Sequence, residues 1–375
     1  MSLTVCLAAN TLVYPEGGGH LWAYLNWALG LRALGCQVVW LEAVRPEVPP
    51  DRLQAAVRTL QQRLEPYGLA QEVAVCSLTE AALAAGSVQG CRSLAEAAEA
   101  DLFLNMLYGM PGSVVRRFRR TALIDIDPGL LQIWMTLGKF GVVPHDTYFT
   151  IGETVGQPGA RFPDAGVRWQ YTPPCVALEW WPTSPALGEA SFTTVSHWRA
   201  EEWMDWEGIY RNDKREGFLP FLDLPQHTSH PLELALCMGE DDEEWAVLRD
   251  KGWRVRHAWD VSSTPSQYQS YIQNSLGEFS CVKPSCVRLQ NAWVSDRTLC
   301  YLASGKPVIV QHTGPSRFLP ECGGLFRFDG LQDAARCLET VMADYEHQCG
   351  LARALAEEHF DARTVAGRVL ERALG

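Results

Sequence analysis

Residues 3–41 read LTVCLAANTLVYPEGGGHLWAYLNWALGLRALGCQVVWL, and they indicate how the rest of the chain is built. The apolar run at 3–9 predicts a strand, the apolar-periodic run at 21–34 predicts a helix, and 36–41 predicts a second strand. Gly35 stands where a helix C-cap belongs, and the second strand is apolar throughout, which is typical of burial on both faces. This βαβ unit indicates a parallel sheet and an α/β protein.

The same alternation continues along the chain. In the first half, strands are predicted at 72–76, 102–106, 122–126 and 148–151, the last closing this half, with helices at 51–64 and 93–100. In the second half, strands are predicted at 192–195, 233–238, 254–258, 278–282, 307–311 and 325–328, with helices at 198–206, 265–273, 296–303 and 331–374.

Prolines at 171–174 and 180–185 separate the two halves, because neither a helix nor a central strand tolerates them there. With 375 residues, the chain also exceeds the size at which one hydrophobic core stops growing. We therefore expect two Rossmann-like parallel-sheet domains that face each other across a cleft, at 1–182 and 183–355. The C-terminal helix at 356–375 is expected to pack back on the first domain.

The composition excludes several classes of protein. Lys plus Arg total 32 against 44 Asp plus Glu, and the net charge of -12 argues against nucleic-acid binding. No apolar run approaches the roughly 18 residues of a membrane span, so no integral membrane segment is expected. The 12 cysteines include no CxxC pair, which argues against a metal site. We expect a cytoplasmic protein with reduced thiols.

The first loop whose residues could take part in binding or catalysis is the glycine-rich turn that ends at His20. Gly18 and Gly19 at a helix start would let main-chain amides approach an anion such as the donor diphosphate. A neutral His20 could take a proton from an acceptor hydroxyl if a carboxylate oriented its other nitrogen. Asp125 and Asp127, at the carboxyl end of a predicted strand, are the expected partners, and strand alternation would turn both toward the cleft.

The same glycine-rich loop also allows the alternative interpretation of a dinucleotide-binding site. A GxGxxG fingerprint would need a third glycine where Trp22 stands, and an indole would obstruct the close packing that glycine permits. Glu42, at the end of the second predicted strand, could still hold a ribose. An NAD-dependent oxidoreductase therefore remains an alternative.

A second group of candidates lies in the C-terminal half, where a helix start follows a strand. Main-chain amides, hydroxyls and a guanidinium there would suit diphosphate oxygens, and a carboxylate could take a ribose hydroxyl. These residues are Ser295, Asp296, Arg297 and Thr298. Lys214 adds a cation ahead of the central strands, and Thr313 and Gly314 follow another strand at the expected cleft rim.

At this point the chain resembles a GT-B glycosyltransferase, a bacterial, nucleotide-sugar-dependent one. The resemblance rests on the Gly19-His20 loop before a helix and on Leu302-Ala303-Ser304-Gly305-Lys306-Pro307-Val308-Ile309, which is similar to the A-x-G-x-P-V-I stretch of that fold. It implies an acceptor-binding first domain and a nucleotide-sugar-binding second domain. It also implies that His20 is the general base, that a nucleoside-diphosphate sugar is the co-substrate, and that no other cofactor and no metal is needed.

Some questions stay open at this level. Trp22, Asn105 and Trp134 are candidate acceptor-binding residues, and Asn105 is a further candidate partner of His20. The paired glutamates of retaining members are replaced by Cys300 and Ala292, which leaves a nucleotide-sugar 2-epimerase as an alternative. A non-catalytic sugar-binding module is a third reading. The acceptor, sugar, nucleotide base, stereochemistry and oligomeric state, a homodimer included, are not determined.

Overall fold

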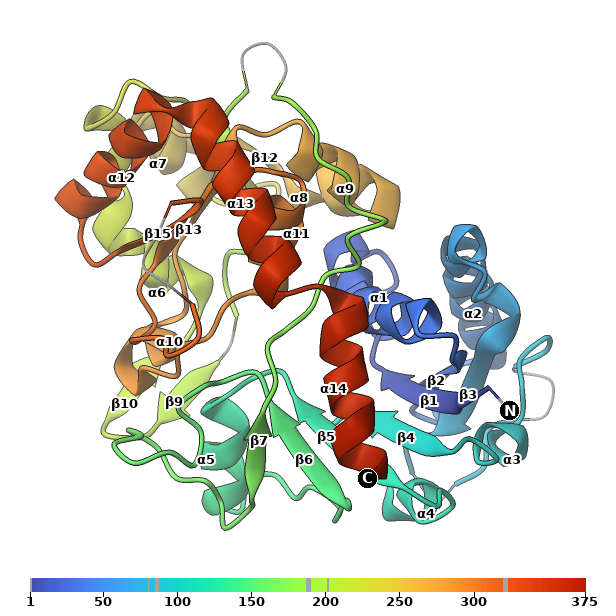
Figure 1. Ribbon diagram of the computed structural model, residues 1–375. Helices are drawn as coiled ribbons and strands as arrows, with labels where there is room; N and C mark the ends of the chain where they lie inside the picture. Colours follow the sequence, from blue (N-terminus) through green and yellow to red (C-terminus); the bar gives the residue numbers. More distant parts are fainter. Residues whose placement is uncertain (1, 80, 85–87, 187–189, 201, 320–322) are drawn as a thin grey trace.

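A computed structural model describes residues 2–79, 81–84, 88–186, 190–200, 202–319 and 323–375. Within them the chain forms two parallel sheets, one in each half of the sequence, with helices on both faces (Figure 1). The prediction of an α/β protein with two Rossmann-like domains is confirmed.

The first sheet has seven strands in the described part of the chain. Their order in space is β3 (Val73–Ser77), β2 (Gln37–Val44), β1 (Thr4–Ala9), β4 (Leu102–Asn105), β5 (Thr121–Asp125), β6 (Thr147–Thr150) and β7 (Trp169–Tyr171). In β1, Val5 and Leu7 belong to one apolar cluster, while Cys6 and Ala8 belong to another. Alternate residues of this central strand are thus buried on opposite faces, as an apolar βαβ strand requires.

Helices cover both faces of this sheet. They are α1 (Gly18–Ala33), α2 (Pro50–Leu64), α3 (Leu94–Ala97), α4 (Gly112–Val115) and α5 (Leu130–Thr136). The apolar cluster of α1 and α2 includes Val5 and Leu7, and the cluster that contains residues of α3 and α4 includes Cys6 and Ala8. The two layers therefore lie on opposite sides of β1.

The second sheet has six strands among the described residues. Their order is β12 (Arg254–His257), β11 (Leu232–Cys237), β8 (Phe192–His197), β13 (Gly277–Ser280), β14 (Val308–Gln311) and β15 (Leu325–Phe328). Its helices are α6 (Lys214–Phe218), α7 (Glu244–Asp250), α8 (Ala258–Ser262), α9 (Pro265–Gln273), α10 (Pro284–Leu289), α11 (Asp296–Ala303), α12 (Leu331–Ala343) and α13 (Tyr345–His359).

The helix predicted at 331–374 is divided into three helices, with breaks at Asp344 and at 360–361, and two short elements also differ from the predictions. The helix predicted at 198–206 is wrong: β9 (Trp203–Asp205) and β10 (Ile209–Arg211) form an antiparallel hairpin, and Glu201 lies outside the described residues. Its turn uses Glu207 and Gly208 at positive φ, which a helix does not accommodate. The strand at 147–150 does not close the first sheet either, because β7 pairs beyond it. Three-residue strands are too short to give a periodic signal.

The chain crosses between the two halves twice, and the crossings are hydrogen-bonded to each other. Val176 N–H donates to the Phe360 carbonyl at 2.8 Å, and Ala362 N–H donates to the Val176 carbonyl at 3.0 Å. After the second crossing, α14 (Ala362–Leu374) lies against α1 (Figure 1). Gly30 of α1 permits this approach, because a Cβ there would be 2.5 Å from the Ala362 carbonyl oxygen.

Across the described ranges, each helix is too short or too polar to cross a lipid bilayer.

Candidate functional site

The carboxyl ends of the two sheets meet at one place between the domains. The loop after β1 carries Tyr14, His20 lies in the first turn of α1, and Asp127 follows β5. From the other domain, His197 ends β8 and Lys283 follows β13. The rings of Tyr14 and His197 are 5.4 Å apart, so the two domains are in contact here. These five residues are called the interdomain site below, and their position is the usual one for ligands in open α/β sheets.

His20 is held by a main-chain carbonyl. Its Nε2 atom lies 2.8 Å from the carbonyl oxygen of Asn10, and the edge of its ring meets Tyr24 with the ring centres 5.3 Å apart. A carbonyl oxygen only accepts hydrogen bonds, so a neutral His20 carries its proton on Nε2 and a lone pair on Nδ1. The expectation that an aspartate orients this ring is therefore corrected, since Asn10 supplies the fixed acceptor instead.

The two aspartates differ in burial but share Tyr108 as a neighbour. Asp125 is fully buried and accepts hydrogen bonds from Gln132 at 2.7 Å and Thr150 at 2.8 Å. Its burial raises the pKa of the carboxyl to about 6. Asp127 is exposed in the interdomain site, where the Tyr108 hydroxyl lies 3.2 Å from its Oδ2. Although β5 ends at Asp125, both carboxylates reach the Tyr108 hydroxyl, and Asp127 N–H donates to Oδ1 of Asp125 at 3.0 Å.

Asp127 is the member of this pair that belongs to the interdomain site. The surrounding protein reduces its hydration and raises the pKa of its carboxyl, while the positive charge of Lys283 lowers it. Lys283 itself is paired with Glu202, with 2.5 Å between Nζ and Oε2. Burial lowers the pKa of His197, and the charges of His20 and Lys283 lower it further. Histidine, carboxylate and lysine groups of both domains therefore influence one another here.

The glycines of the first loop have another role than the predicted one. A Cβ on Gly18 would be 2.2 Å from the Thr264 carbonyl oxygen, and a Cβ on Gly19 would be 2.6 Å from the Tyr268 ring. Both neighbours belong to the second domain. The absence of side chains at Gly18 and Gly19 thus lets the domains touch, and these residues do not face a space for a donor.

Two predicted acceptor residues lie in cores instead. Trp22 is 1% exposed and donates from Nε1 to the Pro265 carbonyl at 3.0 Å, so its indole is part of the contact between the domains. Asn105 is fully buried, and its side-chain nitrogen lies 3.1 Å from Nε2 of His145. Neither side chain can line an acceptor surface. Trp134 on α5 is half-buried and packs against an apolar cluster that includes Leu131 of its own domain and Met204 of the other.

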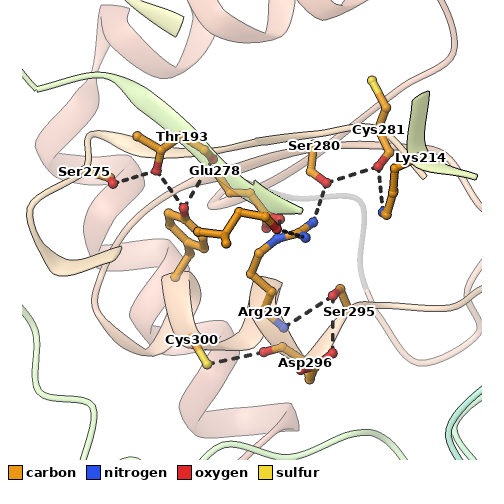
Figure 2. A network of polar contacts seen from close by, with 12 residues as sticks. Thr193, Lys214, Ser275, Glu278, Ser280, Cys281, Ser295, Asp296, Arg297 and Cys300 are labelled. Carbon is orange, nitrogen blue, oxygen red and sulfur yellow. Dashed lines mark hydrogen bonds and ion pairs between the residues drawn. The ribbon is translucent and has the colours of Figure 1, made fainter. Parts of the chain in front are cut away.

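Arg297 on α11 is bound by its own domain rather than free for a ligand. Its Nε atom is 2.8 Å from Oε1 of Glu278, which has no exposed side-chain surface. Its Nη1 atom donates to the Val195 carbonyl at 2.9 Å, and Nη2 donates to Ser280 at 2.5 Å. Figure 2 shows this guanidinium enclosed by its partners. The prediction that Arg297 binds the donor diphosphate is therefore corrected.

The start of α11 still offers polar groups. Ser295 caps the helix by accepting from the Arg297 N–H at 3.3 Å, and Asp296 interacts electrostatically with Asp127 and Tyr24 across the domain boundary. Ser295, Thr298 and Thr313 line a small cavity of about 20 Å³ next to Trp293. Gly314 follows at φ +119, with a Cβ position 2.7 Å from the Gln290 carbonyl oxygen.

Lys214 is placed beside this cavity at the start of α6. Its Nζ atom donates to the Cys281 carbonyl at 2.9 Å (Figure 2). The same atom lies 5.8 Å from the centre of the Trp293 ring. Burial lowers the pKa of Lys214 to about 8, and the charge of Arg297 contributes to this shift. A lysine with one hydrogen bond to a carbonyl retains two donors for an anion.

Sequence reasoning missed three members of the interdomain site: Tyr14, His197 and Lys283. A usable signal existed for the last two, because each stands directly at or after the carboxyl end of a predicted strand. Within the described residues, no group of three or more His, Cys, Asp or Glu side chains is arranged to hold a metal ion.

Several solved glycosyltransferase structures have a similar fold. Anabaena HepE in complex with UDP and glucose is 14% identical, with 99% of each chain covered and a TM-score of 0.57. An alpha-glucosyltransferase in complex with UDP is 9% identical, with 100% of each chain covered and a TM-score of 0.59. A Rickettsia africae glycosyltransferase is 11% identical, with 99% of this chain and 98% of that chain covered and a TM-score of 0.50.

No family model and no curated protein matches the chain by sequence. The structural likeness nevertheless extends over the full length of both partners, so the chain has the GT-B fold of these enzymes. The fold expected from the sequence resemblance is therefore confirmed.

Proposed function

We propose that this protein is a metal-independent glycosyltransferase that moves a sugar from a nucleoside-diphosphate sugar to an acceptor hydroxyl, with His20 as the general base. One observation carries the proposal: in a GT-B fold, a histidine with a lone pair on Nδ1 lies where the carboxyl ends of both sheets meet, close enough to His197 of the other domain for its charge to lower the pKa of that residue. UDP is bound in the HepE and alpha-glucosyltransferase structures, which makes it the first nucleotide to test.

The proposed reaction is a displacement at the anomeric carbon of the sugar. His20 Nδ1 accepts the proton of the acceptor hydroxyl while that oxygen bonds to the anomeric carbon. The bond between this carbon and the diphosphate oxygen breaks, and its electron pair leaves with the nucleoside diphosphate. Lys214 and the main-chain amides at the start of α11 would stabilise this negative charge.

The distribution of charge supports donor binding by the second domain and acceptor binding by the first. On the side of the second domain, Lys214 and Lys283 place positive charge near the start of α11, where a diphosphate would bind. On the side of the first domain, the exposed Asp127 would repel a polyanion. Together with the net charge of -12, this supports an acceptor other than a nucleic acid.

The NAD-dependent alternative loses the residue that motivated it. Glu42 is 1% exposed, and its carboxylate accepts hydrogen bonds from the Thr11 N–H at 2.9 Å and the Leu12 N–H at 3.2 Å. The indole of Trp40 donates to it as well, at 2.9 Å. A carboxylate with these partners orders the loop after β1 and is not available to a ribose.

A nucleotide screen tests the proposal. We expect UDP, dTDP or GDP to raise the melting temperature in the presence of EDTA, while CMP and NAD leave it unchanged. A ligand at a hundred times its Kd adds about 2.7 kcal/mol of stability. The matching nucleotide sugar is then incubated with and without candidate acceptors, and the products are resolved. Release of nucleotide with an epimerised sugar, or no nucleotide binding at all, contradicts the proposal.

Replacing Lys214 is expected to weaken nucleoside-diphosphate binding. A hydrogen bond to a charged group is worth about 1.5–3 kcal/mol, so Lys214→Met should raise the Kd for UDP by at least about tenfold. Calorimetric titration measures this change. Lys139→Met is the matched control, because Lys139 is a surface residue paired with Asp205 at 3.7 Å. Equal affinities for the two variants would count against Lys214 as a donor ligand.

The affinity should also depend on pH. The pKa of Lys214 is about 8, so the free protein loses this positive charge as the pH rises through that value. The Kd for UDP should therefore increase above pH 8 in the natural protein, and it should stay constant over the same range in Lys214→Met. A similar rise in the variant would assign the titration to another group.

A further inference from the structure

A second cavity lies in the C-terminal domain, away from the interdomain site. It has a volume of about 580 Å³ and lies between α8, α9 and the strands β11 and β12. Its lining extends from Glu233 and Arg254, near the amino ends of β11 and β12, to Asp260 and Val261 of α8, which begins where β12 ends. None of its lining residues belongs to the interdomain site or lines the small cavity at the start of α11.

The cavity has a built polar wall. Arg256 binds Glu233 through two contacts, 3.0 Å between Nε and Oε1 and 3.2 Å between Nη2 and Oε2. The Tyr271 hydroxyl donates to the same carboxylate at 2.8 Å, and Arg254 donates from Nη1 to the Ser191 hydroxyl at 3.2 Å. Glu233 is only 8% exposed, so this network is fixed within the domain rather than a loose surface pair.

The charges of the lining residues balance. Arg254 and Arg256 contribute two positive charges, and Glu233 and Asp260 contribute two negative ones. One face of α9 adds uncharged donors and acceptors, namely Ser266, Gln267, Ser270 and Asn274. An apolar ligand would displace water from these polar groups without offering them hydrogen bonds, and an anion would find no net attraction. Hydroxyl groups, which both donate and accept, match the walls best.

We propose that this cavity binds a neutral saccharide. Its volume lies within the range of about 300–1,000 Å³ typical of ligand pockets. The proposal goes beyond sugar transfer at the interdomain site and does not depend on it, since the two sites share no residue.

The position of α9 couples such a ligand to the contact between the domains. The face of α9 opposite to the cavity carries Pro265, whose carbonyl accepts from Trp22 of the first domain at 3.0 Å. Tyr268 lies on the same face against Trp181 of the linker, with ring centres 6.2 Å apart. A saccharide that orders α9 therefore also favours the arrangement in which the two domains touch.

Saccharide binding can be measured without any transfer reaction. Saturation-transfer NMR with glucose, maltose and cellobiose at millimolar concentrations is expected to show binding of at least one of them to the natural protein. Ser270→Trp fills the cavity from α9 and should weaken that binding at least tenfold. His347→Trp, an exposed substitution on α13 of the same domain, should leave it unchanged. Binding that survives Ser270→Trp, or no binding of any of the three sugars, overturns the proposal.

A charge variant tests the chemical class. Asp260 is exposed, and Asp260→Asn gives the cavity a net positive charge without touching the Arg256–Glu233 pair. The natural protein should bind glucose at least as tightly as glucose 6-phosphate, and Asp260→Asn should shift the preference toward the phosphate. A natural protein that prefers glucose 6-phosphate would show that the cavity is an anion site, and the proposal of a neutral ligand would be wrong.

Discussion

His20→Ala is expected to reduce kcat for sugar transfer by about 10²–10⁴-fold, the usual contribution of a positioned general base. The reason is the fixed ring: Nε2 is held 2.8 Å from the Asn10 carbonyl, which leaves Nδ1 as the only site that can accept a proton. Alanine removes that site. The KM for the donor should change little, because the proposed donor contacts are made by Lys214 and the start of α11.

Steady-state transfer with the nucleotide sugar identified by the screen measures this effect. His347→Ala is the control, since His347 is exposed on the surface of α13 and should keep full activity. Melting temperatures of both variants check that the fold is retained. Transfer at the natural rate by His20→Ala would rule out His20 as the base, and would leave a base supplied by the acceptor or by Asp127 to be tested by Asp127→Asn.

The pattern of the sequence predicts the architecture well because parallel strands carry a local signal. The run at 36–41 is apolar throughout, and the structure buries Val39 and Trp40 on opposite sides of β2. The β9–β10 hairpin has no such signal: its strands have three residues each, and their position depends on packing of Met204 against the other domain. Tertiary contacts override local pattern in segments of this length.

The candidate site is predictable only in part, for a related reason. His20 and Asp127 follow from their places after strands, Lys214 from its place after the linker, and Ser295 from the pattern of a helix start. The structure places His20 and Asp127 in the interdomain site, and Lys214 and Ser295 near Trp293 at the start of α11. The role of a glycine is harder to predict, because the sequence does not reveal which atoms of the folded protein approach it. Gly18 meets a carbonyl of the second domain rather than a phosphate, and that neighbour is 246 residues away. The sequence likewise does not reveal that Trp22 contacts the Pro265 carbonyl of the second domain.

Arg297→Met is expected to destabilise the C-terminal domain by about 3–5 kcal/mol, the cost of removing one partner of a buried ion pair. Glu278 has no exposed side-chain surface, and its Oε2 atom already lacks a hydrogen-bond partner among the described residues. Without Arg297 its charge is uncompensated. Chemical denaturation measures the loss, and Arg336→Met is the control, because that ion pair with Asp333 is on the surface and is worth at most about 1 kcal/mol.

The double variant Arg297→Met with Glu278→Leu separates stability from ligand binding. Replacing both charges with apolar side chains removes the uncompensated carboxylate, so most of the lost stability should return. If Arg297 acts only within its own domain, the refolded double variant should bind UDP with the affinity of the natural protein. If Arg297 contacts the diphosphate, as the sequence alone predicted, stability would return while UDP affinity stayed at least tenfold lower. The comparison thus decides whether the Arg297 guanidinium stabilises the second domain or binds the donor diphosphate.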